Sequence, residues 1–124
     1  MKNPRLALCL LILASLCLVP PAGASADQAL PAQGMVTLLD LGAASCIPCK
    51  MMAPILEELK AEYAGRAEVR FIDVSHNRAA IERYKLRGIP TQIFFDRQGR
   101  EVHRHLGFMD KQAIIAVLTG LGVK

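Results

Sequence analysis

The longest apolar run of the chain lies at its start. Residues 6–19 are apolar or small without interruption, Lys2 and Arg5 precede them, and Ala24-Ser25-Ala26 follows. A basic start, a short apolar core and a small-residue cleavage site are typical of a secretory signal peptide, and this run is short for a membrane span. We therefore predict a cleaved signal peptide over residues 1–26 and one domain over residues 27–124. An uncleaved N-terminal anchor is the alternative.

Four later segments have the pattern of β-strands. They are short segments that cover residues 35–41, 67–74, 91–95 and 101–106, and the first of them is an almost entirely apolar run. Asp96-Arg97-Gln98-Gly99 separates the last two, and its Asp and Gly predict a hairpin turn.

Three segments have apolar residues at helical spacing. The clearest covers residues 47–63, where Pro54 should kink the helix because proline lacks a backbone donor. A short helix is predicted over residues 78–85, and Asp110 is a candidate N-cap for a last helix. The order strand, helix, strand, helix, strand, strand, helix predicts an α/β domain, with a mixed sheet of about four strands flanked by helices.

Composition and charge exclude several classes of protein. The formal net charge is +4, but the predicted signal peptide holds two of the 15 basic residues and none of the 11 acidic ones, which leaves +2. So small a charge argues against nucleic acid as the main partner. With 21% charged residues and 52% hydrophobic residues, a disordered chain is also excluded. We expect a soluble globular domain with a single core.

Two cysteines remain once the predicted signal peptide, with Cys9 and Cys17, is removed. Cys46 and Cys49 are separated by two residues, and a disulfide that closes so short a loop adds little stability. Cys46 falls at the predicted start of a helix, where free backbone N–H groups should lower its pKa and make it the attacking sulfur. Cys49 lies one turn further in and is the natural resolving thiol.

Other uses of the pair compete with redox chemistry. A zinc site would need two more ligands, for which His76, His103 and His105 are the candidates. An inert structural disulfide is possible, as is a metallochaperone for a soft ion such as Cu(I), to which Met51 and Met52 would add thioethers. We favour a redox dithiol with no metal and no cofactor.

The chain resembles the thioredoxin family in two segments. Residues 46–59, Cys-Ile-Pro-Cys-Lys-Met-Met-Ala-Pro-Ile-Leu-Glu-Glu-Leu, are similar to the family's active-site helix. Gly88-Ile89-Pro90-Thr91 matches its second signature, with Pro90 at the family's spacing of 44 residues after Cys46. The resemblance covers Met35 to the C-terminus, and it implies a thioredoxin-like fold with a shortened N-terminus.

The resemblance also implies a role for individual residues. Cys46 would be the nucleophile, Cys49 the resolving thiol, and Asp40 the buried carboxylate that assists proton transfer to and from Cys49. A carboxyl group among leucines would have a raised pKa, although an Asp that points to water at a strand end is the alternative. Pro90 would be the family's cis-proline, and Ile89 would offer its backbone to an extended substrate.

Three departures from the family pattern affect the chemistry. Ser45 stands where the family usually has Trp, and Ile47-Pro48 stands between the cysteines where its reducing members favour Gly-Pro. Phe71 replaces a lysine that commonly accompanies the buried Asp. The loss of that cation should raise the pKa of Asp40 further.

We therefore expect a thiol–disulfide oxidoreductase, periplasmic or otherwise exported, that reduces disulfides in other proteins. Its partners would be protein disulfide or dithiol substrates and a membrane electron-transfer protein that reduces it again, and it would act as a monomer. A disulfide-forming oxidant of the same fold is the alternative, but Ile47-Pro48 offers no donor to stabilise the thiolate. A non-catalytic thioredoxin-like binding module is a second alternative.

Overall fold

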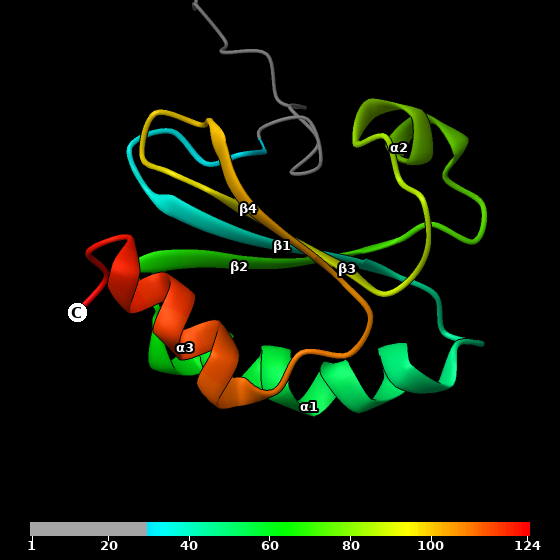
Figure 1. The fold of residues 1–124 in the computed structure, drawn as a ribbon, viewed down its shortest axis with the longest axis horizontal. Helices are drawn as coiled ribbons and strands as arrows, with labels where there is room; N and C mark the ends of the chain where they lie inside the picture. The colour runs from blue at the N-terminus through cyan, green and yellow to red at the C-terminus, as the bar shows by residue number, and fades with distance from the viewer. Residues whose placement is uncertain (1–29) are drawn as a thin grey trace, which may run out of the picture.

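The computed structural model describes residues 30–124, so the predicted signal peptide lies outside the described residues. The elements follow the expected order: β1 Val36–Gly42, α1 Ile47–Glu62, β2 Ala67–Asp73, α2 Arg78–Arg83, β3 Thr91–Phe95, β4 Glu101–Leu106 and α3 Lys111–Gly120 (Figure 1). None of the helices in this part of the chain is long and apolar enough to cross a membrane.

The four strands form one mixed sheet in the order β2-β1-β3-β4. β1 runs parallel to β2, while β3 is antiparallel to both β1 and β4. Every residue of β1 and β3 is buried, as expected for central strands covered on both faces. This architecture confirms the predicted mixed sheet of four strands flanked by helices.

Helices cover both faces of the sheet, with α1 and α3 on one side and α2 on the other (Figure 1). The α1 and α3 side holds the larger core, which includes Leu38, Leu59 and Phe94. The α2 side holds the smaller one, around Leu39 and Ile93. Alternation along β1 explains this division, because successive side chains of a strand point to opposite faces.

Helix ends lie close to where the sequence predicts them. Asp110 is the N-cap of α3, and its Oδ1 accepts a hydrogen bond from the Ala113 N–H at 2.8 Å. The helix predicted over residues 78–85 is shorter and ends at Arg83. Lys85 has φ of 49°, a left-handed conformation that cannot continue an α-helix. α1 continues through Pro54, and the predicted kink there stays a prediction.

The pairing of β1 with β3 decides where the site lies. Leu41, near the end of β1, pairs with Thr91, the first residue of β3. Cys46 follows β1 after a short turn and Pro90 directly precedes β3, so both lie at the same end of the sheet.

We predict that Leu118→Ala destabilises the protein by roughly 2–5 kcal/mol, because it removes a fully buried side chain by which α3 packs on the sheet. The measurement is denaturant unfolding followed by circular dichroism, since the chain has no Trp. The neighbouring Thr119 is exposed, so Thr119→Ala should cost less than about 0.5 kcal/mol. Equal effects of the two substitutions would contradict the described packing of α3.

Candidate active site

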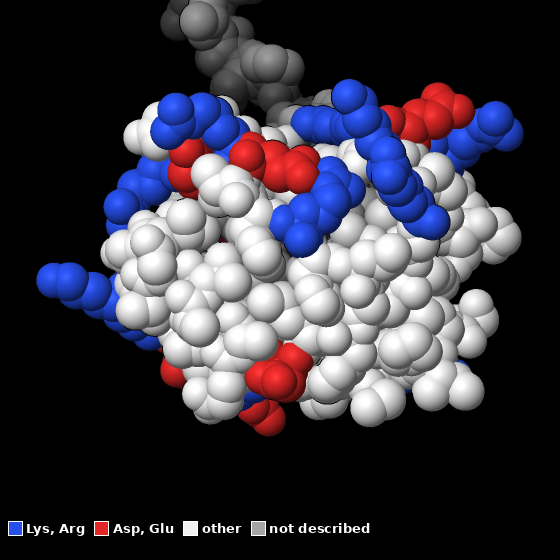
Figure 2. All heavy atoms as spheres, in the orientation of Figure 1, with Lys and Arg blue, Asp and Glu red and all other residues white. Residues whose placement is uncertain are grey.

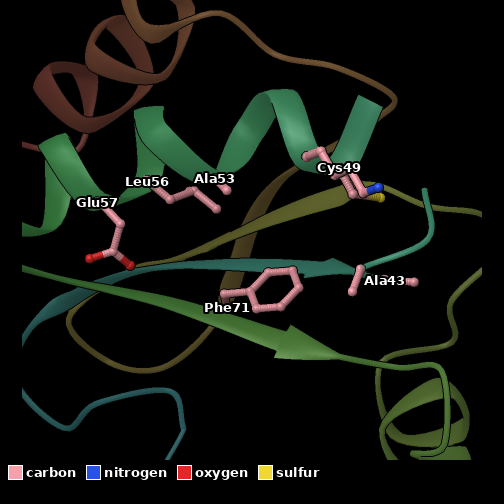
Figure 3. A pocket seen from close by; sticks show the side chains of 8 residues that line it. Ala43, Cys49, Ala53, Leu56, Glu57 and Phe71 are labelled. Carbon is pink, nitrogen blue, oxygen red and sulfur yellow. The ribbon is translucent and has the colours of Figure 1, made fainter. Parts of the chain in front are cut away.

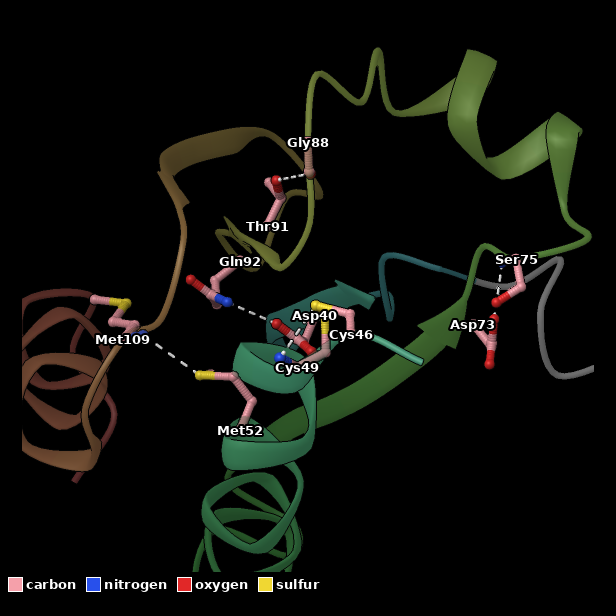
Figure 4. Close-up of a disulfide and its surroundings, with 10 residues drawn as sticks. All are labelled: Asp40, Cys46, Cys49, Met52, Asp73, Ser75, Gly88, Thr91, Gln92 and Met109. Atoms are coloured by element: carbon pink, nitrogen blue, oxygen red, sulfur yellow. Dashed lines mark hydrogen bonds between the residues drawn. A yellow bond between two sulfur atoms is a disulfide. The ribbon is translucent and has the colours of Figure 1, made fainter. Parts of the chain in front are cut away.

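Cys46 and Cys49 form a disulfide at the N-terminus of α1, with their Cα atoms 5.2 Å apart (Figure 4). Cys46 is half-buried, whereas only 4% of Cys49 is exposed. This difference in burial agrees with the expectation for Cys49 as the inner cysteine. A partner molecule can therefore reach the sulfur of Cys46 more easily than that of Cys49.

The start of α1 favours a negative charge on Cys46 in the reduced protein. Cys46 is the N-cap of the helix, and its Sγ accepts a hydrogen bond from the Cys49 N–H at 3.3 Å. The first turn holds no acidic residue, and Pro48 occupies a position at which its missing N–H costs nothing. The free N–H groups and the helix dipole can therefore stabilise a thiolate at Cys46.

Asp40 is fully buried in β1, which excludes the alternative of a strand-end Asp that points to water. The Gln92 side-chain Nε2–H donates a hydrogen bond to Asp40 Oδ1 at 2.7 Å (Figure 4). Burial raises the pKa of Asp40 to about 6, because it penalises the charged form, and the hydrogen bond from Gln92 offsets part of that effect. Asp40 can therefore change its protonation state close to neutral pH.

Asp40 belongs to a row of four side chains across the sheet. It pairs with Phe71 of β2 and with Gln92 of β3, and Gln92 pairs in turn with His105 of β4. Phe71, at the position where the family commonly has lysine, offers Asp40 no cation. The polar neighbour of Asp40 in this row is thus the neutral amide of Gln92, on the opposite strand.

Sequence reasoning missed Gln92. The available signal was a long polar side chain inside the apolar run of residues 91–95, two positions after Pro90. A buried glutamine needs a hydrogen-bond partner, and that requirement alone points to a polar residue on a neighbouring strand.

The Ile89–Pro90 peptide bond is cis, as the resemblance implies. Pro90 is buried, and its carbonyl accepts a hydrogen bond from the Gly107 N–H at 2.8 Å. Ile89 is 36% exposed, and no backbone hydrogen bond engages it within residues 30–124. Its backbone groups are therefore available to another chain, although the predicted substrate-binding role of Ile89 and Pro90 stays a prediction.

A cavity of about 380 Å³ lies between α1 and β2 and reaches Cys49 (Figure 3). Its lining is mostly apolar and comprises Ala43, Ala44, Cys49, Lys50, Ala53, Leu56, Glu57 and Phe71. Sheet and helix approach closely beside it. A Cβ atom at Gly42 would lie 3.1 Å from Cys49 Sγ and 3.1 Å from the Phe71 ring. The glycine therefore lets the cysteine pair lie directly against the end of β1.

Within residues 30–124 no three His, Cys, Asp or Glu side chains gather as ligands for a metal ion. His76 is exposed, and His103 packs against the ring of Phe94 with centroids 5.5 Å apart. The Nε2 of His105 lies 3.1 Å from the Phe108 carbonyl oxygen. Among the described residues, none of the three histidines considered as zinc ligands therefore lies in a cluster that could hold a metal ion.

We predict that Asp40→Asn makes the oxidised protein more stable above pH 7 and has little effect below pH 4. The raised pKa of Asp40 means that the neutral carboxyl stabilises the fold fully below its ordinary value of 3.8, and that this stability is lost as the pH rises through about 6. A shift of this size corresponds to at most roughly 3 kcal/mol. Urea unfolding between pH 4 and pH 8 measures the difference.

Asp73→Asn is the matched control. Hydrogen bonds from the Ser75 side chain and from its backbone N–H lower the pKa of Asp73, so Asp73 stabilises the fold at neutral pH and loses this effect in acid. Its substitution should therefore change the pH dependence in the opposite direction. If Asp40→Asn left the pH dependence of unfolding unchanged, the carboxyl group would not be buried as described.

Comparison with known proteins agrees with this arrangement. The Thioredoxin family model matches residues 22–120. A thioredoxin of Staphylococcus aureus is 42% identical over 83 residues, which are 67% of this chain and 79% of that one. The thioredoxin Deadhead of Drosophila melanogaster is 33% identical with a TM-score of 0.63, over 71% of this chain and 82% of that one.

A further solved structure, that of the exposed lipoprotein thioredoxin Etrx1 of Streptococcus pneumoniae, has the same fold at 23% identity, with a TM-score of 0.66 over 71% of this chain and 86% of that one. The family match spans the strands, the helix and the cysteine pair that make up the site described above. The chain therefore belongs to the thioredoxin family, and with its Cys46–Cys49 pair it is a thiol–disulfide oxidoreductase that acts on protein disulfides.

Proposed function

We propose that the protein is exported and reduces disulfides in proteins of the periplasm, or of the cell surface where there is no outer membrane. The observation that carries the chemistry is the placement of the two sulfurs, with a half-buried Cys46 that caps α1 and a buried Cys49 one turn later. The signal peptide predicted over residues 1–26 supports export.

The reaction proceeds by two exchange steps. The Cys46 thiolate attacks one sulfur of a substrate disulfide, which forms a mixed disulfide and releases the other substrate sulfur as a thiolate. Cys49 then transfers its proton to the carboxylate of Asp40 and attacks Cys46 Sγ. This second step releases the remaining substrate sulfur, which takes up a proton, and leaves the Cys46–Cys49 disulfide. Two electrons pass from the protein to its substrate.

The surface around Cys46 suits an extended protein segment. Three exposed apolar residues lie at the same end of the sheet as Cys46: Ile47 starts α1, Ile89 precedes β3 and Phe108 follows β4. Figure 2 shows charged side chains of both signs along the upper edge of the view, with a broad area without charged side chains below them. Contacts with the backbone of Ile89 and with apolar side chains would bind many sequences.

The residues between the cysteines support the proposed direction of electron flow. Ile47 and Pro48 offer no side-chain donor to the Cys46 thiolate beyond the helix terminus, which favours a reductant over a strong oxidant. An exported reductant must be reduced again outside the cytoplasm. A membrane electron-transfer protein is the partner that this compartment requires, and the domain acts on it and on its substrates as a monomer.

We predict that Cys49→Ser accumulates covalent mixed disulfides with envelope proteins, because the resolving sulfur is missing once Cys46 has attacked. Non-reducing gels of cells that express the variant, followed by mass spectrometry, identify the trapped proteins. Cys46→Ser is the matched control and should trap none, since Cys49 is buried. Equal trapping by both variants, or by neither, would argue against Cys46 as the nucleophile.

We predict a reduction potential for the Cys46–Cys49 pair of roughly −270 mV, close to that of reducing thioredoxins. Equilibration with dithiothreitol or glutathione, followed by alkylation of free thiols and mass measurement, gives the value. A potential near −120 mV would instead make the protein a disulfide-forming oxidant. The absence of any thiol-dependent reduction of insulin would leave only a binding module.

A further inference from the structure

Gln92 is an unusual residue for the middle of a buried strand. It lies in β3 with its side chain fully buried, among neighbours in the strand that are mostly apolar. Transfer of an amide from water to such a place costs free energy unless its polar atoms find partners. The single hydrogen bond found for its side chain within residues 30–124 is the one from Nε2 to Asp40 Oδ1. Asp40 is thus the residue that offsets part of the cost of burying the Gln92 amide.

Asp40 in turn lies next to the first turn of α1. Gly42 follows it by two residues on the same face of β1, and a Cβ atom there would touch Cys49. Figure 4 shows the carboxyl group of Asp40 pointing toward the disulfide, with the amide of Gln92 on its other side. Gln92 is therefore one side chain removed from the reacting sulfurs, behind the carboxyl group.

We infer that Gln92 is a positioning residue of the exchange reaction, which holds the carboxyl group of Asp40 toward Cys49 in both of its protonation states. This inference rests on the proposed function, in which Asp40 accepts the proton of Cys49. The ionised carboxylate accepts the hydrogen bond from Nε2 that the structure shows. A protonated carboxyl group needs an acceptor as well, and the amide oxygen of the same glutamine can supply it after rotation of the amide.

The unpaired atoms of the two side chains fit this exchange. Asp40 Oδ2 and Gln92 Oε1 are both buried and have no hydrogen-bond partner within residues 30–124. Each residue thus has one unpaired oxygen atom. When the carboxyl group of Asp40 is protonated, Gln92 Oε1 is the unpaired acceptor on the amide that already bonds it. An apolar residue at position 92 would provide neither the donor nor the acceptor, and a lysine would favour only the ionised carboxylate.

Few charged groups compete with Gln92 for control of Asp40. β2 presents Phe71, and α1 presents the two cysteines, while Lys50 and Glu57 of α1 line the cavity that reaches Cys49. β4 presents His105, which is paired with Gln92 and not with Asp40. The neutral amide is therefore the nearest polar group that can respond when Asp40 gains or loses its proton.

The test compares pH profiles of disulfide reduction between pH 5 and pH 9. Reduced full-length protein reacts with a disulfide peptide, and the single-turnover rate is recorded for the wild type and for Gln92→Met, which keeps the length of the side chain without its hydrogen bond. The hydrogen bond that Gln92 donates favours the ionised carboxylate over the protonated carboxyl group, so its loss should move the acid limb up by roughly one pH unit. The rate on that limb should then fall roughly tenfold, and by more than the rate at pH 9, where Asp40 is ionised in both proteins.

Two controls separate positioning from a general loss of structure. Gln98→Met changes an exposed glutamine of the hairpin and should leave the profile where it is. In an Asp40→Asn background, Gln92→Met should produce no shift. A Gln92→Met profile that coincides with that of Gln98→Met, or a shift that persists without the carboxyl group, would overturn the inference.

A measurement on the wild type decides the matter if the Gln92 variant does not fold. In an NMR titration the side-chain amide signals of Gln92 should change with the same midpoint as the carboxyl carbon of Asp40. Amide signals that stay constant through that midpoint would refute the inference. A wild type without turnover at any pH would contradict the proposed function, and the titration would still decide whether Gln92 responds to Asp40.

Discussion

The antiparallel pairing of β1 with β3 places almost every chemical group of this protein. It sets Asp40 opposite Gln92 and the end of β1 opposite the residue that follows Pro90. Groups some 50 residues apart in sequence thereby meet at one end of the sheet. A register slip of one residue would turn Asp40 and Gln92 to opposite faces and break the site. The same pairing buries Leu38 and Leu39 in the two cores, so the apolar pattern that stabilises the fold also protects the register.

The site combines two environments that act on different groups. At the start of α1, backbone N–H groups face the partly accessible Cys46 and favour a negative charge. In the central strand β1, Asp40 is fully buried, and burial disfavours a negative charge on its carboxyl group. The thiolate of Cys46 is stabilised where it meets the substrate. The proton acceptor behind it, Asp40, has a raised pKa and is therefore readily protonated. The helix N-terminus thus favours the charged form of the nucleophile Cys46, whereas burial in the core disfavours the charged form of the base Asp40.

Much of this arrangement could be predicted from the sequence, because it depends on local patterns. Helical spacing and the Asp110 cap identify α1 and α3, and the CxxC at a strand-to-helix boundary identifies the redox pair. The hydrogen bond between Asp40 and Gln92 could not be found in the same way, since it depends on which residues of two strands face each other. The early end of α2 was missed because it results from a left-handed Lys85, which no local motif marks.

Gly42 shows how closely the strand and the redox helix are joined. Any side chain at this position would force Cys49 or Phe71 to move by a few tenths of an ångström. The strand itself would tolerate such a residue, because its φ angle does not require glycine. The size of the residue at position 42 is therefore limited by the neighbouring side chains of Cys49 and Phe71 and not by the backbone of the strand. A larger residue at this position would require either the ring of Phe71 or the first turn of α1 to shift.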